Sequence, residues 1–439
     1  MPQQSRWIAD KDKERALEYV RELLKHFVSD ADRQIHWQRD FSMDRQLEVL
    51  SQRVNLGAMS KDDVLVREIV MAALVELAQA QFEEVTLSDF EQALGTVIRR
   101  YTEKPEVEWH VLCPLYLDGP RISQCQTIQV LGVQFTLYSW GDIGNLSGMP
   151  SFWQEAQVAL EKDEDATLAL LLGFVPLMAT RRDRIAGEAF RQVEDAYNLL
   201  RALINLVDGY GRRIMQFGKS SPLAICLPPP VFGVFGTDYA FEALYLDDST
   251  RRLRKAPLSI ERGVKVAETI ERLSGISEAI RPRVVDAILK FGQAVETTDW
   301  RSSYLSLWQA LESLAFASHG TSTDDIVRRI ANLLRAQRED RELLTLLSQR
   351  RNELVHLGRF SQAGLRQVMF LKLFTERAIS RFLTLAARLP TPKHWQEYYD
   401  QLAAPTKDLR IRGEVIQYIV ESTDPADAAT VCHQATHVL

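Results

Sequence analysis

The hydrophobic pattern of this chain changes period twice, and that change limits what the chain can fold into. Over residues 10–102 apolar residues recur at helical spacing, as in ALEYVRELLKHFV. Near Pro105 the pattern gives way to stretches rich in Val, Ile, Tyr and Trp with partial alternation, VEWHVLCPLYL and TIQVLGVQFTLYSW, which are typical of strands. From about residue 259 the helical spacing returns. This order predicts an α+β multidomain protein.

The same pattern predicts four regions. We expect a helical N-terminal region over 1–103, an α+β domain with a sensor or regulatory role over 104–258, a helical bundle over 259–392 and a C-terminal tail over 393–439. Within the α+β domain we expect strand structure over 166–180, a loop over 141–150 and a helix over 183–207, and the Pro triplet in PLAICLPPPVFGVFG favours a sheet edge. Ser88 and Glu91 stand at capping-box spacing at the start of the third N-terminal helix.

Composition is that of an ordinary globular chain. Its 439 residues are 46% hydrophobic and 26% charged. The longest uncharged apolar run, ATLALLLGFVPLMAT, is too short for a membrane span and contains Pro176, and MPQQSRWIADKDKER lacks the apolar core of a signal peptide. The four cysteines are scattered without a CxxC pair, which favours a reducing compartment. We therefore expect a cytoplasmic protein without a membrane partner.

Charge is unevenly distributed along the chain. The net charge is −6, yet residues 323–388 hold thirteen Lys and Arg against seven Asp and Glu, a local charge of +6. A basic segment within an acidic chain indicates a polyanionic partner such as nucleic acid.

Two helices of the last block carry the candidate site. In SSYLSLWQALESLA one stripe holds six residues and leaves Glu312 on its flank: Tyr304, Leu307, Trp308, Leu311, Leu314 and Ala315. In DRELLTLLSQRRNELVHL the apolar set is Leu343, Leu344, Leu347, Leu354 and, less clearly, Val355. Asn352 and His356 are at i,i+4 and lie on one flank, and the long side chain of Arg351 can reach the same place. Gly358 suits the left-handed position that ends a helix, which puts His356 in the last turn.

The spacing from Arg351 to His356 is weak evidence alone. The chain repeats it in RELLKH, from Arg21 to His26, where neither an asparagine after the arginine nor a glycine after the histidine is present. The second match, RNELVHLG, has both, and it lies in the arginine-rich segment downstream of LWQALESLA.

On these residues the segment 285–390 resembles the HEPN domain, in particular its Apea-like branch. The resemblance rests on the R-polar-x3-H motif, RNELVH here, and on the acidic residue of the preceding W-x-A-L-E-x-L helix, which is Glu312 here. It implies an all-α bundle of four to five helices, dimerisation through that bundle and, in catalytic members, metal-independent cleavage of RNA. Apea-like members are linked to abortive antiphage immunity, so the resemblance also implies a defence or toxin-like role.

Each residue has an expected part in that chemistry. The 2′-OH of RNA attacks the adjacent phosphate, so a base, an acid and a cation near the phosphorane are needed. His356 would be the acid/base, Arg351 would bind the phosphate, Asn352 would orient the phosphate or the histidine, and Glu312 would hold Arg351 or His356. Arg350 and Arg359 are further candidates for RNA contacts. We expect no metal and no cofactor. Because one copy supplies one histidine for two proton transfers, a homodimer with a composite site is expected. The alternative is a HEPN module without activity that dimerises or binds nucleic acid or nucleotide.

Other patterns are weaker. FGKSS lacks the first glycine of a phosphate-binding loop, since Arg213 stands there. Cys432, His433 and His437 lie close together in the sequence, and His433 and His437, at i,i+4, could form a metal pair. A frayed tail is the simpler interpretation of this segment. Trp300, Trp308 and Trp395 are expected in the core rather than stacked on bases.

Overall fold

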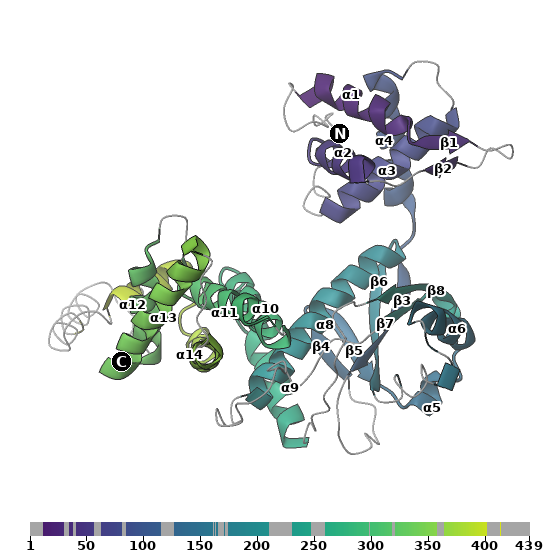
Figure 1. Cartoon of the computed structure of the whole chain (residues 1–439). Helices are drawn as coiled ribbons and strands as arrows, with labels where there is room; N and C mark the ends of the chain where they lie inside the picture. The colour runs from purple at the N-terminus through teal and green to yellow at the C-terminus, as the bar shows by residue number, and fades with distance from the viewer. Residues whose placement is uncertain are drawn as a thin grey trace, which may run out of the picture. The chain divides into compact units, whose positions relative to one another are not determined.

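The chain divides into two compact units. The structure, a computed structural model, describes residues 12–29, 35–37, 41–56, 63–80, 85–115, 127–160, 162, 164–165, 171, 174–209, 231–246, 260–297, 299–317, 321–357, 364–401 and 413. One unit contains Met1–Val107 with Arg182–Ala189, and the other contains Glu108–Arg181 with Phe190–Leu439. The prediction of a mixed α+β chain is confirmed (Figure 1). No helix among the described residues has the length and apolar character that crossing a membrane requires.

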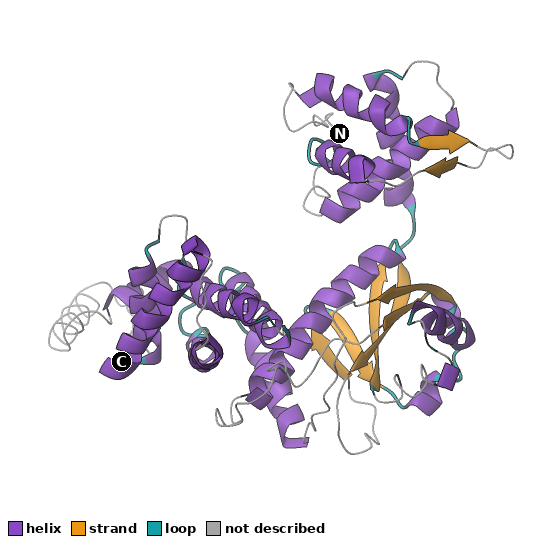
Figure 2. Ribbon diagram, viewed as in Figure 1, coloured by secondary structure: helices purple, strands orange, loops and turns teal. Residues whose placement is uncertain are grey.

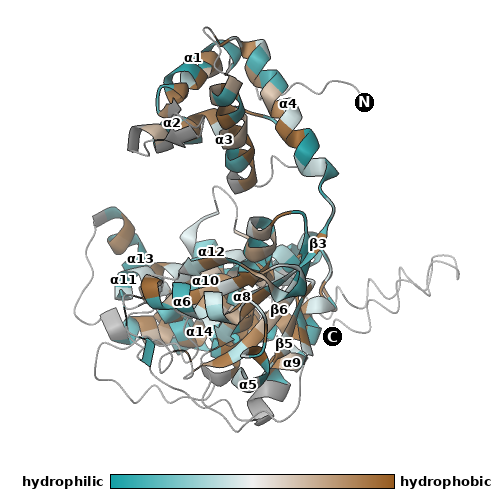
Figure 3. Ribbon diagram, turned by 90° about the vertical axis from the view of Figure 1, so that its right-hand side faces the viewer, coloured by the Kyte–Doolittle hydropathy of each residue, from teal (hydrophilic) through white to brown (hydrophobic). Residues whose placement is uncertain are grey.

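The first unit is a cluster of helices with one small hairpin. Its elements are α1 (Asp12–Leu24), β1 (Phe27–Ser29), β2 (Ile35–Trp37), α2 (Phe41–Ser51), α3 (Asp63–Ala80) and α4 (Leu87–Glu103). The amphipathic α4 shows both brown and teal bands in Figure 3, and it buries Phe90, Ala93 and Leu94 in the core that α1, α2 and α3 share.

Two details of this unit differ from the sequence prediction. The antiparallel pair β1–β2 lies where the sequence predicted the end of a helix followed by a connection over 29–45. The capping box of α4 uses Thr86 and Asp89 rather than Ser88 and Glu91. Thr86 has the extended backbone of an N-cap and accepts a bond from the Asp89 amide at 3.3 Å, while its own amide donates to Asp89 at 2.8 Å. Ser88 is already inside the helix, where its hydroxyl cannot cap it.

A six-stranded sheet lies at the heart of the α+β part of the second unit (Figure 2). The strand order is β4-β5-β6-β3-β7-β8, and the pairings β4–β5, β5–β6, β3–β7 and β7–β8 are antiparallel. The strands are β3 (Val107–Leu115), β4 (Thr127–Val130), β5 (Val133–Leu137), β6 (Val175–Asp183), β7 (Val231–Phe235) and β8 (Phe241–Leu246), and the 3-10 helix η2 (Thr237–Tyr239) joins the last two.

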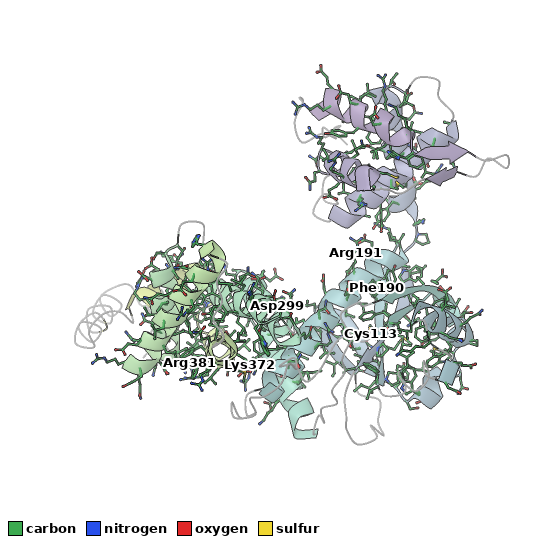
Figure 4. The ribbon with its side chains drawn as sticks, viewed as in Figure 1. Cys113, Phe190, Arg191, Asp299, Lys372 and Arg381 are labelled. Carbon is green, nitrogen blue, oxygen red and sulfur yellow. The ribbon has the colours of Figure 1, made fainter. Side chains whose placement is uncertain are left out.

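Helices cover both faces of the sheet. On one face lies α8 (Ala186–Gly209), where Phe190, labelled in Figure 4, stacks on Tyr245 with ring centroids 3.8 Å apart. The other face is covered by α5 (Trp140–Ile143) and α6 (Met149–Ala159). There a Cβ at Gly233 would come within 2.7 Å of the Phe152 ring, so only glycine lets α6 approach β7 this closely.

The sequence prediction placed two segments of this sheet region incorrectly. The expected loop at 141–150 contains the end of α5 and the first residues of α6, because Ser139 and Asp142 form a capping box that starts a short helix. The strand expected over 166–180 begins at Val175 and runs on to Asp183.

The C-terminal part of the second unit is a bundle of helices. They are α9 (Ile260–Ser274), α10 (Arg281–Glu296), α11 (Trp300–Leu314), α12 (Thr323–Leu334), α13 (Arg338–Leu357), α14 (Gly364–Leu385) and α15 (Pro392–Gln401). The bundle meets the sheet helix α8 closely, since a Cβ at Gly292 of α10 would lie 2.7 Å from that of Ala202. An ion pair of 3.3 Å between the buried Arg201 of α8 and Glu296 of α10 strengthens this contact.

Candidate active site on α11 and α13

The helix α11 is anchored by its apolar stripe. Asp299 is its N-cap and accepts bonds from the amides of Arg301 and Ser302. The six residues predicted as the stripe are all at most 1% exposed, which confirms that this face packs in the core. Glu312 therefore lies at the edge of the buried face, and its side chain is 25% exposed.

The helix α13 presents the predicted motif in its last two turns. Leu344, Leu347 and Leu354 are buried, whereas Val355 is 49% exposed and belongs to the surface rather than the core. The helix ends at Leu357 with His356 in its last turn, as the sequence predicted. Gly358 and Arg359 lie outside the described residues.

A buried hydroxyl joins the two helices one turn before the motif. Tyr304 of α11 donates its hydroxyl to the carbonyl oxygen of Leu347 on α13 at 2.5 Å. Burial raises the pKa of Tyr304 well above its ordinary value, so the phenol stays protonated and remains a donor. This bond fixes the position of α13 along α11.

Glu312 and Arg351 meet where α11 and α13 cross. Oε1 of Glu312 accepts a bond from Nε1 of Trp308 at 2.9 Å and lies 3.4 Å from Nη2 of Arg351. Nη1 of Arg351 donates to the side-chain oxygen of Asn352 at 3.3 Å. The Arg351 side chain is 27% exposed, so its guanidinium is held by the protein and still reachable from solvent. Three of the four predicted catalytic residues are thus in one hydrogen-bonded chain.

His356 stands apart from that chain. It is exposed, and within the described part of the chain no hydrogen bond or ion pair involves its imidazole. Its position four residues after Asn352 puts the two side chains on one face of α13.

The predicted RNA contacts are less clearly placed. Arg350 is exposed and pairs with Glu353 one turn later, which offsets part of its charge. Several other arginines of the basic segment serve the bundle itself. Arg329 donates to the carbonyl of Ala315 at 2.9 Å, and Arg341 donates to the carbonyl of Ala336 at 3.2 Å. The local +6 is therefore only partly available to a polyanion.

The other candidates of the sequence have structural roles or lie outside the described residues. Arg21, in the second match to the spacing, bonds the carbonyl of Val85 through both Nε and Nη2. Trp395 is fully buried and stacks on Phe382 at 3.8 Å, in agreement with a core role. Cys432, His433 and His437 fall outside the described residues, and no group of three or more His, Cys, Asp or Glu among the described ones could hold a metal ion.

Sequence reasoning missed the two aromatic donors of α11. Tyr304 and Trp308 were identified only as apolar members of the stripe. The available signal was their chemistry, because a buried phenol or indole usually finds an acceptor, and Trp308 stands one turn before Glu312.

Comparison with protein-family models gave no match for this chain, and comparisons with curated proteins and with solved structures gave none either. The Glu312–Arg351 cluster is distinguished by its own geometry: a partly exposed guanidinium held by a carboxylate, beside an amide and one turn from an exposed imidazole.

Proposed function

We propose that this chain is a metal-independent endoribonuclease of the HEPN type that acts in antiphage defence or in a toxin-like role. The observation that supports it is the Glu312–Arg351 pair, which holds a guanidinium at the surface beside Asn352 and one turn from His356. The role in defence follows only from the resemblance of RNELVH and LWQALESL to the Apea-like branch.

The reaction is an attack of the 2′-oxygen of a ribose on its own 3′-phosphorus. The 2′-hydroxyl proton goes to a base, the bond to the 5′-oxygen of the next nucleotide breaks, and an acid protonates that oxygen. The products are a 2′,3′-cyclic phosphate and a 5′-hydroxyl. Arg351 has five N–H donors, of which two are used by Glu312 and Asn352, so others can bind the phosphorane oxygens.

Two proton transfers need two acid/base groups, and one chain offers one histidine at this site. A homodimer that apposes two α13 helices would supply the second. Val355 stands four residues after Arg351 on α13 and is 49% exposed, so an interface between two α13 helices would cover it. We propose that His356 of one copy acts as the base and His356 of the other as the acid.

The second candidate function is a HEPN module that binds RNA or nucleotide without cleaving it. Specific contacts favour this alternative: Glu312 partly neutralises Arg351, and Arg350 is paired with Glu353. A site with this charge balance would bind phosphate weakly and could lack the cationic strength that the phosphorane needs.

The two functions differ in one assay. Wild type, Arg351→Ala and His356→Ala are incubated with labelled single-stranded RNA in EDTA, and the products are tested for a cyclic phosphate. The matched control is His26→Ala, because RELLKH has the same spacing in the other unit. The nuclease is supported if only wild type and His26→Ala cleave the RNA. It also requires that neither protein cleaves an oligonucleotide with a 2′-deoxyribose at the cut site. Equal cleavage by all four proteins contradicts the site, and binding without cleavage supports the module.

A further inference from the structure

Two aromatic side chains of α11 connect the buried core to the guanidinium of Arg351. Tyr304 and Trp308 are one turn apart and at most 1% exposed. The only side-chain donor of Tyr304 binds a carbonyl of α13, and that of Trp308 binds Glu312, the carboxylate that contacts α13. Neither can touch a bound molecule, because both are buried.

Tyr304 acts on the backbone that carries Arg351. In an α-helix the carbonyl of residue 347 is the acceptor for the amide of residue 351. The hydroxyl of Tyr304 binds this same Leu347 carbonyl at 2.5 Å. The turn of α13 that begins the motif is therefore fixed to α11 at the oxygen that also holds the Arg351 amide.

Trp308 acts on the side chain that holds Arg351. Its indole N–H and Nη2 of Arg351 share one oxygen of Glu312, at 2.9 and 3.4 Å. A carboxylate without the indole bond could rotate and take Arg351 in a bidentate fork, which is the stronger geometry for such pairs. The fork would take a second N–H donor of the guanidinium and leave fewer donors for a phosphate. The indole bond therefore keeps the contact between Glu312 and Arg351 monodentate, through one carboxylate oxygen and one guanidinium nitrogen.

We propose that Tyr304 and Trp308 are positioning residues that hold the guanidinium of Arg351 open toward a phosphate on the surface of α13. This inference rests on the proposed nuclease function for its kinetic consequence, while the positioning itself is a property of the folded chain.

Matched variants test the kinetic consequence. Tyr304→Phe and Trp308→Phe remove one donor each. Tyr197→Phe and Trp140→Phe are the controls, because Tyr197 donates to the carbonyl of Pro114 at 2.8 Å and Trp140 to that of Phe174 at 2.8 Å, both in the sheet part. With RNA as substrate we expect kcat to fall about tenfold for Trp308→Phe and about threefold for Tyr304→Phe with KM nearly unchanged, since transition-state stabilisation is lost. The controls should keep the wild-type kcat.

A double variant identifies the route. If Trp308 acts through the carboxylate, then adding Trp308→Phe to Glu312→Gln should reduce kcat by much less than tenfold, because the link is already altered. Additive losses, or wild-type kcat in both single variants, would overturn the inference. Thermal unfolding of every variant separates positioning from loss of the fold, since Tyr304→Phe removes one oxygen atom only.

A measurement without cleavage separates this inference from the nuclease proposal. In protein with ¹⁵N-labelled arginine, the Nε–Hε resonance of Arg351 is assigned by its absence in Arg351→Lys. We expect it to shift in Trp308→Phe and to stay in place in Trp140→Phe. An unshifted resonance overturns the positioning role even if wild type cleaves RNA. A shifted resonance in a protein that cleaves no RNA supports the positioning role and contradicts the nuclease.

Discussion

The Nη2 atom of Arg351 lies 3.4 Å from Oε1 of Glu312, so a guanidinium on α13 is tied to a carboxylate that stands 39 residues earlier on α11. Both side chains are about a quarter exposed, at 27% and 25%. Solvent screening at this depth makes the pair a weak contributor to stability. The pair instead orients the guanidinium, because an arginine held by a carboxylate on one side directs its remaining N–H donors in a fixed direction.

Replacing the planar guanidinium of residue 351 by an ammonium group tests whether the orientation of its donors matters. Arg351→Lys keeps the charge but loses the planar fork that matches a phosphate. We expect kcat for RNA cleavage to fall about 100-fold, close to the loss for removing one oxyanion donor. Binding of a non-cleavable 2′-deoxy oligonucleotide should change little, since a lysine still attracts phosphate. Lysine with full activity would show that charge alone is needed.

The exposed valine of α13 tests the composite site. Val355→Asp puts a charge at a position that is 49% exposed beside Arg351. If two copies meet there, sedimentation should show a larger fraction of monomer, and RNA cleavage should fall with it. Val158→Asp on α6 is the matched control, because that valine is 74% exposed in the sheet part. A variant that stays dimeric and active would remove α13 from the interface.

The N-cap of α11 gives a prediction with a pH dependence. Hydrogen bonds from Ser302, its hydroxyl above all, hold the pKa of Asp299 below its ordinary value. A carboxyl with a depressed folded pKa stabilises the fold above its unfolded pKa, and this stability is lost as pH falls through the folded value. Asp299→Ala should therefore cost about 1 kcal/mol at neutral pH. The difference from wild type should begin to shrink as pH falls below the ordinary aspartate pKa of about 3.9, and it should vanish only below the lower pKa of the folded state.

Hydrogen exchange of the α11 amides measures this effect locally, which suits a chain of two units whose global unfolding need not be two-state. Asp299→Asn is the control, since its amide oxygen can still cap the helix. An Asp299→Ala protein with unchanged exchange at neutral pH would show that the cap contributes nothing to α11.

Features that follow from the helical spacing of apolar residues could be predicted from the sequence. Contacts that depend on where two helices cross could not. The stripe from Tyr304 to Leu314 could be predicted because apolar residues at helical spacing must share one face. The bond from Tyr304 to Leu347 could not, since it depends on where α13 crosses α11, 43 residues later. The same limit applies to Glu312. Its position on the flank of the stripe could be predicted, but the sequence did not indicate whether it would contact Arg351 or His356.

Local backbone conformation set a second limit. The turn between β4 and β5 places both Leu131 and Gly132 at positive φ, 49° and 78°. This conformation fits a two-residue hairpin turn, for which Asn-Gly is the usual signal. Leucine disfavours positive φ, so the sequence TIQVLGVQFTLYSW gave no reason to divide one long strand pattern into two paired strands.

The ion pair inside α14 gives the last prediction. Lys372, labelled in Figure 4, bonds Glu376 one turn later, and the two residues are 8% and 2% exposed. Burial raises the pKa of Glu376 above its ordinary value, while the charge of Lys372 opposes that rise. Glu376→Leu leaves a buried ammonium without its partner and should destabilise the protein by about 3 to 5 kcal/mol.

The double variant Lys372→Met with Glu376→Leu removes both charges and keeps similar volume, so it should recover most of the lost stability. Urea unfolding measures the stability of all three proteins: wild type, Glu376→Leu and the double variant. Since Lys372 also lies 5.9 Å from the Phe291 ring of α10, the methionine can keep the contact with that ring. A double variant as unstable as Glu376→Leu would mean that the pair is needed for packing α14 against α10, rather than tolerated there because each charge neutralises the other.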